Sequence, residues 1–560
     1  MARYRFLILV LLPFAALFAC ASPPEPADLV LTGGTVFTAD SARTLAEAVA
    51  VRGNRIAAVG DADDIAAYIG PGRTRVIELD GAFVTPGFND AHAHLLGVGE
   101  AMESLDLAGV TSWDVICQLV AERVGQAEQG ELVKGMRWDQ TLVGDGDQWP
   151  TKDLIDPVSP DNPVILRRVD GHSVLVNSYA LREAKITSAT PDPEGGAIVR
   201  DKSGEPTGVL KENAMGLLGA EIYGARNDPA VQERRVALAL RRAAEVGVTS
   251  ITEIGGDPKV LEKLAREHRL TARISYSPSL TDEISTLIRY EALRAAWEQY
   301  PTLRFGFLKN FMDGTLGSAT AALFRPFNDN PSTSGVLVQT VEELTRKVLI
   351  ADRRGFQIGI HAIGTRANRL VLDIYQQAIV ENGRRDSRHR IEHSQILTEM
   401  DIPRFSSLGV IASMQPTHCI TDRSYAESRL GKARCRYAYA WRSLLDAGAV
   451  VAFGSDAPVE ALDPLEGLYA AVSRKDRAGE DGPGWIPQEK ISMAEAIKLY
   501  TTVPAYAEFQ ECEKGMLVPG MLADLAVFDR NLLEAGEREI MSSRVLYTVF
   551  DGEIIYENTY

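Results

Sequence analysis

The stretch "PGFNDAHAHLLG" at residues 86–97 places two histidines, His92 and His94, two positions apart. In a β-strand, residues two apart project from the same side of the chain, so both imidazoles would point the same way. Imidazole nitrogens are common ligands of zinc and related ions. Alone, the pair is a weak signal for a metal site, and other segments of the chain have to support it.

Three further apolar runs carry metal-ligand residue types. "QIGIHAIG" contains His361, "RHRIEHSQI" contains His393, and "VVAFGSDAP" contains Asp456. Four of the eight histidines of the chain therefore stand at such positions. Imidazole and carboxylate are ligands that Zn²⁺ and similar ions use. If these runs are strands that end at one place, their side chains predict a metal site.

A lysine, Lys309, occupies the corresponding place in the run "LRFGFLKNFMDG". An ammonium group has no lone pair and cannot bind a metal. One interpretation is an ion pair with Asp313, four residues on. The other is carboxylation by CO₂, which converts the neutral amine into an anionic carbamate that can bridge two metals. Desolvation lowers the pKa of a lysine toward the neutral form, and the residues alone leave both interpretations open.

The elements that must position these side chains are eight apolar runs between residues 86 and 504, several of them separated by amphipathic helical patterns such as "DPAVQERRVALALRRAAEVG". This alternation predicts a (β/α)8, TIM-like barrel, whose active sites gather at the carboxyl ends of the strands. A ninth run at 162–172 is assigned to an insertion of about 100–225 between the first and second barrel strands. The barrel is expected to span residues 86–504.

The two ends of the chain are expected to form a second, smaller domain. Residues 28–85 show short strand patterns broken by Gly-Gly and Gly-Asn, and residues 505–560 repeat this style in "ADLAVFDR" and "RVLYTVFDGEIIYE". Neither piece is large enough for its own core. One β-sandwich built from both ends is therefore predicted, in an α/β protein overall.

Residues 1–27 are expected to be a signal peptide and tether. Two arginines precede the uncharged run "FLILVLLPFAALFA", which is too short to span a bilayer comfortably and has the layout of a secretory signal. "LFAC" resembles a lipobox with Cys20 as the lipidated residue, whereas Ala19-Cys20-Ala21 also fits ordinary cleavage. Either way, the pattern predicts an exported bacterial protein, periplasmic or membrane-anchored through Cys20.

The composition of the chain limits the classes of molecule that it is expected to bind. The 560 residues carry a net charge of −17, which argues against nucleic acid and anionic membrane surfaces as partners. A small-molecule substrate is expected, and no oligomeric state is predicted. Besides Cys20, four cysteines show no CxxC spacing and are expected to be buried free thiols, although a Cys419–Cys435 disulfide stays open.

The order H-x-H, Lys, His, His, Asp on successive strands resembles the amidohydrolase superfamily. The segments "TPGFNDAHAHL", "DGHSVLVNS", "LKNFMDGTLGS", "IHAIG", "IEHSQ", "GSDAPV" and "LVPGMLADLAVFD" are similar to its YtcJ-like branch, which includes N-substituted formamide deformylases. The similarity covers residues 28–555. Its motifs are specific for the fold and the site and unspecific for the substrate.

The resemblance implies roles for the six residues. His92, His94 and Asp456 would hold the more buried metal, and His361 and His393 would hold a second. Lys309, as a CO₂-derived carbamate, would bridge them. One or two Zn²⁺ ions per chain are expected, with other divalent metals as alternatives. Asp456 would also move a proton from the attacking water to the leaving nitrogen.

Four residues are candidates on the substrate side. His172, within the insertion, is expected to contact substrate or stabilise an oxyanion, with a structural role as the alternative. Trp138 is a candidate pocket wall or a core residue. Asp313 would shape the turn after its strand or contact substrate, and His418 could reach the site from the seventh strand.

These observations predict a metal-dependent hydrolase of non-peptide C–N bonds that acts on amide, N-acyl or N-formyl substrates. Hydrolysis of a cyclic amide, an ester or a carbamate by the same site is an alternative. A metal-using isomerase is another, and so is a non-catalytic surface binding protein on the same scaffold. Fold-level resemblance does not choose among substrates.

Overall fold

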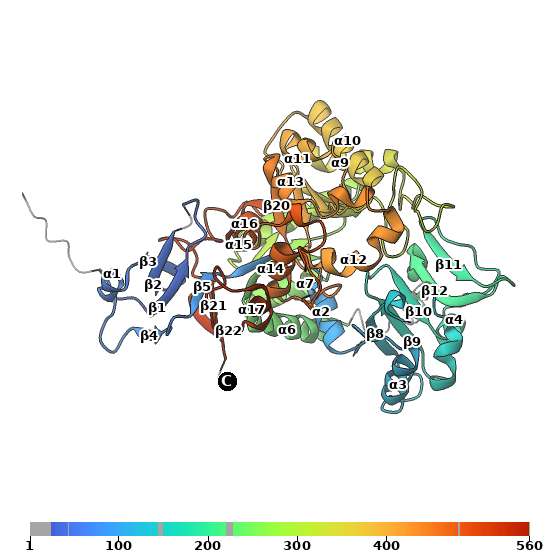
Figure 1. The fold of residues 1–560 in the computed structure, drawn as a ribbon, viewed down its shortest axis with the longest axis horizontal. Coiled ribbons are helices and arrows are strands. Elements are labelled where there is room, and N and C mark those ends of the chain that lie inside the picture. The colour runs from blue at the N-terminus through green and yellow to red at the C-terminus, as the bar shows by residue number, and fades with distance from the viewer. Residues whose placement is uncertain (1–23, 43, 144–148, 220–227, 480–481, 559–560) are drawn as a thin grey trace, which may run out of the picture.

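The computed structural model describes residues 24–42, 44–143, 149–219, 228–479 and 482–558. Figure 1 shows an elongated molecule with a central α/β body, a β-sheet of both chain ends on one side and an insertion on the other. The predicted signal peptide and the lipid anchor at Cys20 lie outside the described residues. None of the described helices combines the length and the hydrophobicity needed to cross a membrane.

The central body contains two parallel sheets. One has the order β15-β14-β13-β6 and the other β16-β17-β18-β19-β20. Their strands are β6 (Phe88–Ala93), β13 (Val248–Ile254), β14 (Arg273–Ser277), β15 (Leu303–Phe305), β16 (Leu308–Phe311), β17 (Ile358–Ala362), β18 (Arg390–His393), β19 (Ile411–Met414) and β20 (Val450–Phe453). Each of the eight predicted runs contains a strand, and the run "LRFGFLKNFMDG" is divided into β15 and β16.

Hydrogen bonds connect the two sheets, among them one from β16 to the residue after β14 and one from the segment after β20 to β6. The Lys309 N–H donates to the Pro278 carbonyl at 2.8 Å, and the Asp456 N–H donates to the His92 carbonyl at 2.7 Å. Strands such as β13, "VTSITEI", are buried throughout, as parallel strands covered on both faces are. The body is an α/β enzyme fold of the TIM-barrel type. Its closure into one eight-stranded barrel stays a prediction.

Helices alternate with these strands. They are α6 (Pro229–Glu245), α7 (Pro258–Arg266), α8 (Ile284–Trp297), α9 (Val341–Arg353), α10 (Thr365–Asn382), α11 (Ile402–Leu408), α12 (Pro416–Leu430), α13 (Trp441–Asp446), α14 (Pro464–Ser473), α15 (Met493–Leu499) and α16 (Thr502–Ala507). Three of them start with an Asp-Pro pair, at Asp228, Asp257 and Asp463. The aspartate accepts a backbone hydrogen bond at the N-cap, and proline suits the first helical position.

The insertion forms a six-stranded sheet with the order β11-β12-β10-β9-β8-β7. Its strands are β7 (Leu105–Asp106), β8 (Val133–Trp138), β9 (Val164–Arg168), β10 (Ser173–Val176), β11 (Gly196–Arg200) and β12 (Pro206–Glu212), with helices α2 (Leu95–Met102), α3 (Trp113–Val124) and α4 (Ser178–Glu183). Separate apolar clusters pack on its two faces. The sheet lies at the opposite end of the molecule from the chain termini (Figure 1).

Strands from both chain ends share one eight-stranded sheet. They are β1 (Leu29–Phe37), β2 (Leu45–Arg52), β3 (Arg55–Gly60), β4 (Arg75–Glu78), β5 (Phe83–Pro86), β21 (Leu525–Phe528), β22 (Val545–Phe550) and β23 (Glu553–Glu557), with helices α1 (Ala62–Ala66) and α17 (Glu537–Ser542). The join is the antiparallel pair of β5 and β21, with Val84 opposite Val527. Whether this sheet is best described as a β-sandwich stays a prediction, as do the domain boundaries.

Cys117, Cys419, Cys435 and Cys512 are all free thiols. The prediction that they are unpaired is confirmed, but the prediction that all four are buried is wrong, because Cys512 is exposed and Cys117 is only half-buried. The alternative disulfide between Cys419 and Cys435 is therefore wrong, although both side chains are buried.

Candidate metal centre

The six predicted ligand residues come from five strands and line one cavity of about 620 Å³. They are His92 and His94 at the end of β6, Lys309 in β16, His361 in β17, His393 at the end of β18, and Asp456 after β20. Parallel strands bring their carboxyl ends to the same side of the fold, which explains how residues hundreds of positions apart meet.

The carboxylate of Asp456 lies between three of the imidazoles. Its Oδ1 is 3.5 Å from His92 Nε2 and 3.2 Å from His94 Nε2, and its Oδ2 is 3.9 Å from His393 Nδ1. His92, His393 and Asp456 each offer a ligand atom within 4.8 Å of the others. This tight group takes members from both predicted ligand sets, so the division of ligands between two metals stays a prediction.

Hydrogen bonds fix the orientation of the imidazole rings. The Nδ1 atom of His92 is 2.6 Å from Glu392 Oε2, and that of His393 is 2.8 Å from Gln415 Oε1. The Nδ1 atom of His94 is 3.1 Å from the carbonyl of Ile254. When an oxygen accepts a hydrogen bond from the N–H of one ring nitrogen, the other ring nitrogen carries the lone pair that can bind a metal.

Burial keeps three of the imidazole rings, those of His92, His361 and His393, neutral. It lowers the pKa of His92 and lowers those of His361 and His393 well below the ordinary value. In contrast, the pKa of Asp456 lies well below its usual range, because the neighbouring histidines outweigh the effect of burial. Neutral imidazoles beside an ionised carboxylate are the protonation states in which these groups bind metals.

Lys309 is buried, and among the described residues its Nζ has no hydrogen-bond partner. The Nζ lies 3.9 Å from the ring centre of Phe311. Burial lowers the pKa of the ammonium to about 8, against the attraction of Glu392 and Asp456. The alternative ion pair with Asp313 is wrong, since no ion pair joins these two residues in the described structure.

The residues fit a divalent metal. Besides Lys309 Nζ, the buried Nδ1 of His361 also has no hydrogen-bond partner in the described part of the chain. Buried polar atoms almost always have a hydrogen-bond partner. Two buried nitrogens without one in the same cavity therefore indicate a site for a bound group such as a metal ion. The donor set, with four imidazoles and one carboxylate, is that of zinc and related ions.

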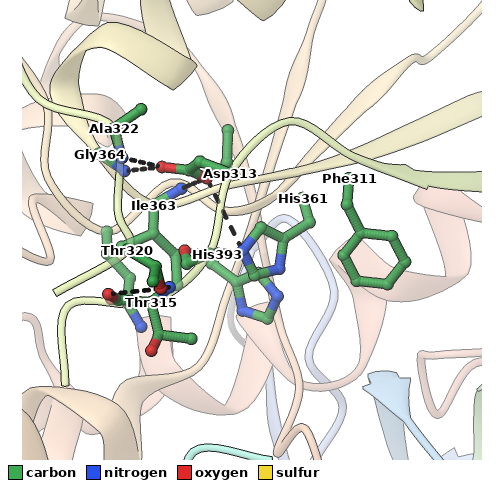
Figure 2. Close-up of polar contacts among 12 residues, drawn as sticks. Phe311, Asp313, Thr315, Thr320, Ala322, His361, Ile363, Gly364 and His393 are labelled. Carbon is green, nitrogen blue, oxygen red and sulfur yellow. Dashed lines mark hydrogen bonds and ion pairs between the residues drawn. The ribbon is translucent and has the colours of Figure 1, made fainter. Parts of the chain in front are cut away.

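Asp313 holds the turn that carries His361, as Figure 2 shows. Its carboxylate accepts the backbone N–H groups of Ile363, Gly364 and Ala322 at 2.8–2.9 Å. One oxygen lies 3.7 Å from His361 Nε2. These contacts occupy the carboxylate, so the structure supports a turn-shaping role for Asp313 over contact with substrate, although the turn that it holds follows β17 and not its own strand, β16.

His172 reaches the cavity from the insertion. Its Nδ1 lies 2.7 Å from Glu212 Oε2, and its ring centre is 5.3 Å from that of His361. Burial alone would lower its pKa, but Glu212 and Asp170 outweigh it and raise the pKa to about 9. The ring is therefore protonated at neutral pH and can donate from Nε2 into the cavity.

The other two substrate-side candidates differ in position. His418 is buried, and its Nε2 lies 3.9 Å from Asp456 Oδ2, so it does reach the site. Trp138 is fully buried in the core of the insertion, where its indole N–H donates to the Leu166 carbonyl. Of the two alternatives for Trp138, the structure supports the core residue over the pocket wall, because its ring packs against Trp113 and Trp149 and does not line the cavity.

Sequence reasoning missed the residues behind the ligands. Glu392 contacts His92 and is itself held by Arg390, whose Nε is 2.8 Å from Glu392 Oε1. Gln415, at the end of β19, orients His393. The charged pair Arg390 and Glu392 inside the buried strand "RIEH" is a signal that could have revealed these two residues, but no such signal marks Gln415. His393 and Asp456 also have left-handed backbones, with φ of 76° and 59°, a strain that clusters at functional sites.

A family model described as "Amidohydrolase family" matches residues 75–556. The chain belongs to the amidohydrolase family. The putative amidohydrolase YtcJ of Bacillus subtilis is 34% identical, with 94% of this chain and 99% of that protein covered. The N-substituted formamide deformylase of Arthrobacter pascens is 29% identical, with 95% and 99% covered. The resemblance inferred from the motifs is confirmed.

A solved structure agrees with this amidohydrolase assignment. An uncharacterised metal-dependent hydrolase of Pyrococcus furiosus is 27% identical, with a TM-score of 0.70, and the match covers 90% of this chain and 100% of that one. The chain is therefore a metal-dependent hydrolase of the amidohydrolase superfamily.

Proposed function

We propose that this amidohydrolase cleaves the C–N bond of a small amide, with N-acyl and N-formyl compounds as substrates. The observation that carries the proposal is Lys309, a buried lysine with an unpartnered Nζ in the same cavity as four histidines and Asp456. An unpaired buried charge is destabilising and needs a functional reason. The N-substituted formamide deformylase relative supports the choice of bond and substrate class.

His92, His94, His361, His393 and Asp456 would hold one or two zinc ions. When bound, such an ion lowers the pKa of a water toward ~7 and polarises the substrate carbonyl. The neutral imidazoles and the ionised Asp456 need no change of protonation to serve as ligands. Zinc, as opposed to another divalent metal, is part of the proposal.

Lys309 would carry a carbamate. With its pKa lowered to about 8, a usable fraction of the side chain is neutral amine near neutral pH. The Nζ lone pair attacks CO₂, an N–C bond forms, and one proton leaves to solvent. The product is an anion, which replaces an unpaired buried cation by a group that is attracted to bound metal ions.

Asp456 and His172 would handle protons and developing charge. The Asp456 carboxylate accepts a proton from the attacking water and delivers it to the leaving nitrogen, so that an amine and a carboxylic acid are released. His172, held at Nδ1 by Glu212, donates a hydrogen bond from Nε2 to the carbonyl oxygen as negative charge grows there. Both side chains line the same cavity.

The test combines metal content with turnover. Elemental mass spectrometry on protein purified without chelators should find one to two zinc-type ions per chain. A panel of N-formyl and N-acyl amines should yield an acid and an amine, identified by mass. Lys309→Ala should lower the metal content and reduce turnover at least about 100-fold. The exposed Lys432→Ala is the matched control and should behave like the unaltered protein.

Two outcomes would contradict the proposal. Full turnover in Lys309→Ala would show that a carbamate on Lys309 is not needed for the reaction. A metal-replete protein that hydrolyses no amide on the panel would remove the amidase activity itself.

A further inference from the structure

The cavity wall carries four arginine and lysine side chains besides Lys309: Arg137, Arg167, Arg168 and Lys347. Two of them are neutralised by carboxylates. Arg168 lies 2.8 Å from Asp139 and 2.9 Å from Asp170, and Arg137 donates from Nε to Asp106 at 3.1 Å. These two arginines therefore serve the structure of the insertion.

Arg167 and Lys347 have no such partner. Among the described residues, no carboxylate lies within ion-pair distance of either head group. Arg167 donates from Nη1 to the Gly171 carbonyl at 3.0 Å, and Lys347 donates from Nζ to Gln339 Oε1 at 3.0 Å. Neutral oxygens orient both cations, and Asp282, which Lys347 attracts from a longer distance, is itself paired with Arg346, so no acid neutralises either head group.

Both side chains are held on the wall by their elements. Arg167 alternates in β9 with Leu166 and Arg168, which are fully buried, whereas Arg167 is only partly covered. Lys347 lies in α9 and is anchored through Gln339, whose Nε2 also donates to Asn310 Oδ1 at 2.6 Å. An insertion strand and a helix of the central body thus present positive charge to one cavity.

The acids of the wall do not cancel this charge. Glu100 is 2.5 Å from Lys134, and Glu212 is paired with His172. Glu253 has no cationic partner in the described structure, but burial raises its pKa to about 8, against two backbone N–H groups, so it is largely neutral at pH 7. In a chain of net charge −17, two uncompensated cations in a cavity attract an anion.

We propose that the substrate carries a carboxylate away from the scissile C–N bond, and that Arg167 binds this carboxylate with Lys347 as a second positive charge. The planar guanidinium matches a carboxylate with two parallel hydrogen bonds, which a neutral group cannot reproduce. The substrate class becomes N-acylated amino acids and similar amide acids. This inference rests on the proposed amide hydrolysis, for which it names the specificity residue.

The test compares two probes that differ only in the carboxylate: racemic N-formylphenylalanine and N-formyl-2-phenylethylamine. With the metal-loaded enzyme, kcat/KM should be at least about 10-fold higher for the acid. Arg167→Met should lower kcat/KM for the acid about 10- to 100-fold, mainly through KM, as expected for loss of a charged hydrogen bond. The neutral probe should change less than about 3-fold, and Arg167→Lys should recover part of the loss for the acid.

A matched control is Arg241→Met, which removes an exposed arginine from the outer face of α6 and should change neither probe. Equal kcat/KM for the two probes in the unaltered enzyme would overturn the inference and leave the amidase proposal standing. Equal losses on both probes in Arg167→Met would also overturn it, because they would show a structural role. If Arg167→Met kept the preference for the acid, residues other than Arg167 would recognise the carboxylate, and the role inferred for Arg167 would be wrong.

Binding gives a readout that does not depend on turnover. In an Asp456→Asn background, titration calorimetry should show at least about 10-fold tighter binding of the acid than of the neutral probe. Adding Arg167→Met should abolish this difference. No binding of the acid up to millimolar concentration would overturn the inference, even if the panel of amides had already failed and with it the proposed function.

Discussion

At the scale of single residues, Glu392 decides how His92 is presented. Its carboxylate lies 2.6 Å from His92 Nδ1 and is also bound by Arg390. Burial would raise its pKa, but Arg390 and His92 outweigh burial and hold the pKa below the usual range. The carboxylate therefore stays ionised and keeps the His92 proton on Nδ1, so the Nε2 lone pair faces the metal cavity.

We expect Glu392→Gln to weaken metal binding about 10- to 100-fold, the range typical for loss of a group that orients a metal-ligating histidine. Competition with a chromogenic chelator measures the affinity directly. The exposed Glu342→Gln is the matched control. Unchanged affinity in Glu392→Gln, with circular dichroism showing intact structure, would contradict the role of Glu392.

The ligands themselves could be predicted, because each ends an apolar run and the runs converge in a parallel α/β fold. Gln415 could not, since it meets His393 only through the pairing of β18 with β19, which one sequence does not show. The choice between pocket wall and core for Trp138 stayed open for a related reason. A large apolar residue in a strand can pack on either face of a sheet. The ring contacts of Trp138 with Trp113 and Trp149, which place it in the core, are visible only in the structure.

At the scale of elements, Glu253 connects the end of β13 to the start of α2. Its carboxyl accepts the backbone N–H of Leu95, in the first turn of that helix and directly after His94. Burial raises its pKa to about 8, against this and one further backbone hydrogen bond. Between the unfolded pKa near 4.5 and about 8, the folded state keeps a proton that the unfolded state has lost. Stability conferred by this group therefore falls as pH rises through that window.

Glu253→Gln keeps an oxygen for the helix and cannot ionise. In chelator-treated protein, we expect the variant to gain on the order of 2 kcal/mol over the unaltered chain at pH 9, and nothing at pH 5. Scanning calorimetry at a fixed rate across this range measures the difference. The exposed Glu298→Gln should follow the unaltered protein at every pH. Parallel pH profiles for Glu253→Gln and the unaltered chain would show that the carboxyl is not coupled to folding.

The strands and helices were predictable where local signals are strong. Buried parallel strands read as apolar, β-branched runs, and the Asp-Pro starts of α6, α7 and α14 are helix signals in themselves. The division of the run "LRFGFLKNFMDG" into two strands was not predictable. Gly306 sits between β15 and β16, where an added Cβ would meet the Ser275 and Ser277 hydroxyls at 2.7–2.8 Å. Only the packed neighbours reveal that close approach.

At the scale of the whole molecule, the sheet of the chain ends is tied to the central body by a buried ion pair. Arg273, in β14, lies 2.7 Å from Asp524 Oδ2 and 2.7 Å from Asp551 Oδ1. The Arg273 and Asp524 side chains are 6% and 5% exposed. Asp524 precedes β21 and Asp551 follows β22, so one guanidinium gathers two turns of the C-terminal segment against the strand next to β13.

Removing one partner of a buried pair leaves the other charge unpaired, which costs about 3–5 kcal/mol. We therefore expect Arg273→Met to lower the unfolding temperature by about 3–5 °C, as scanning calorimetry would show. Arg75→Met breaks the exposed pair with Glu557 in the same sheet and should cost less than about 1 kcal/mol. Because Arg273 is not part of the metal cavity, Arg273→Met should keep its metal content per folded molecule. Loss of metal at temperatures where the variant is folded would instead show that the terminal sheet helps to position the ligands.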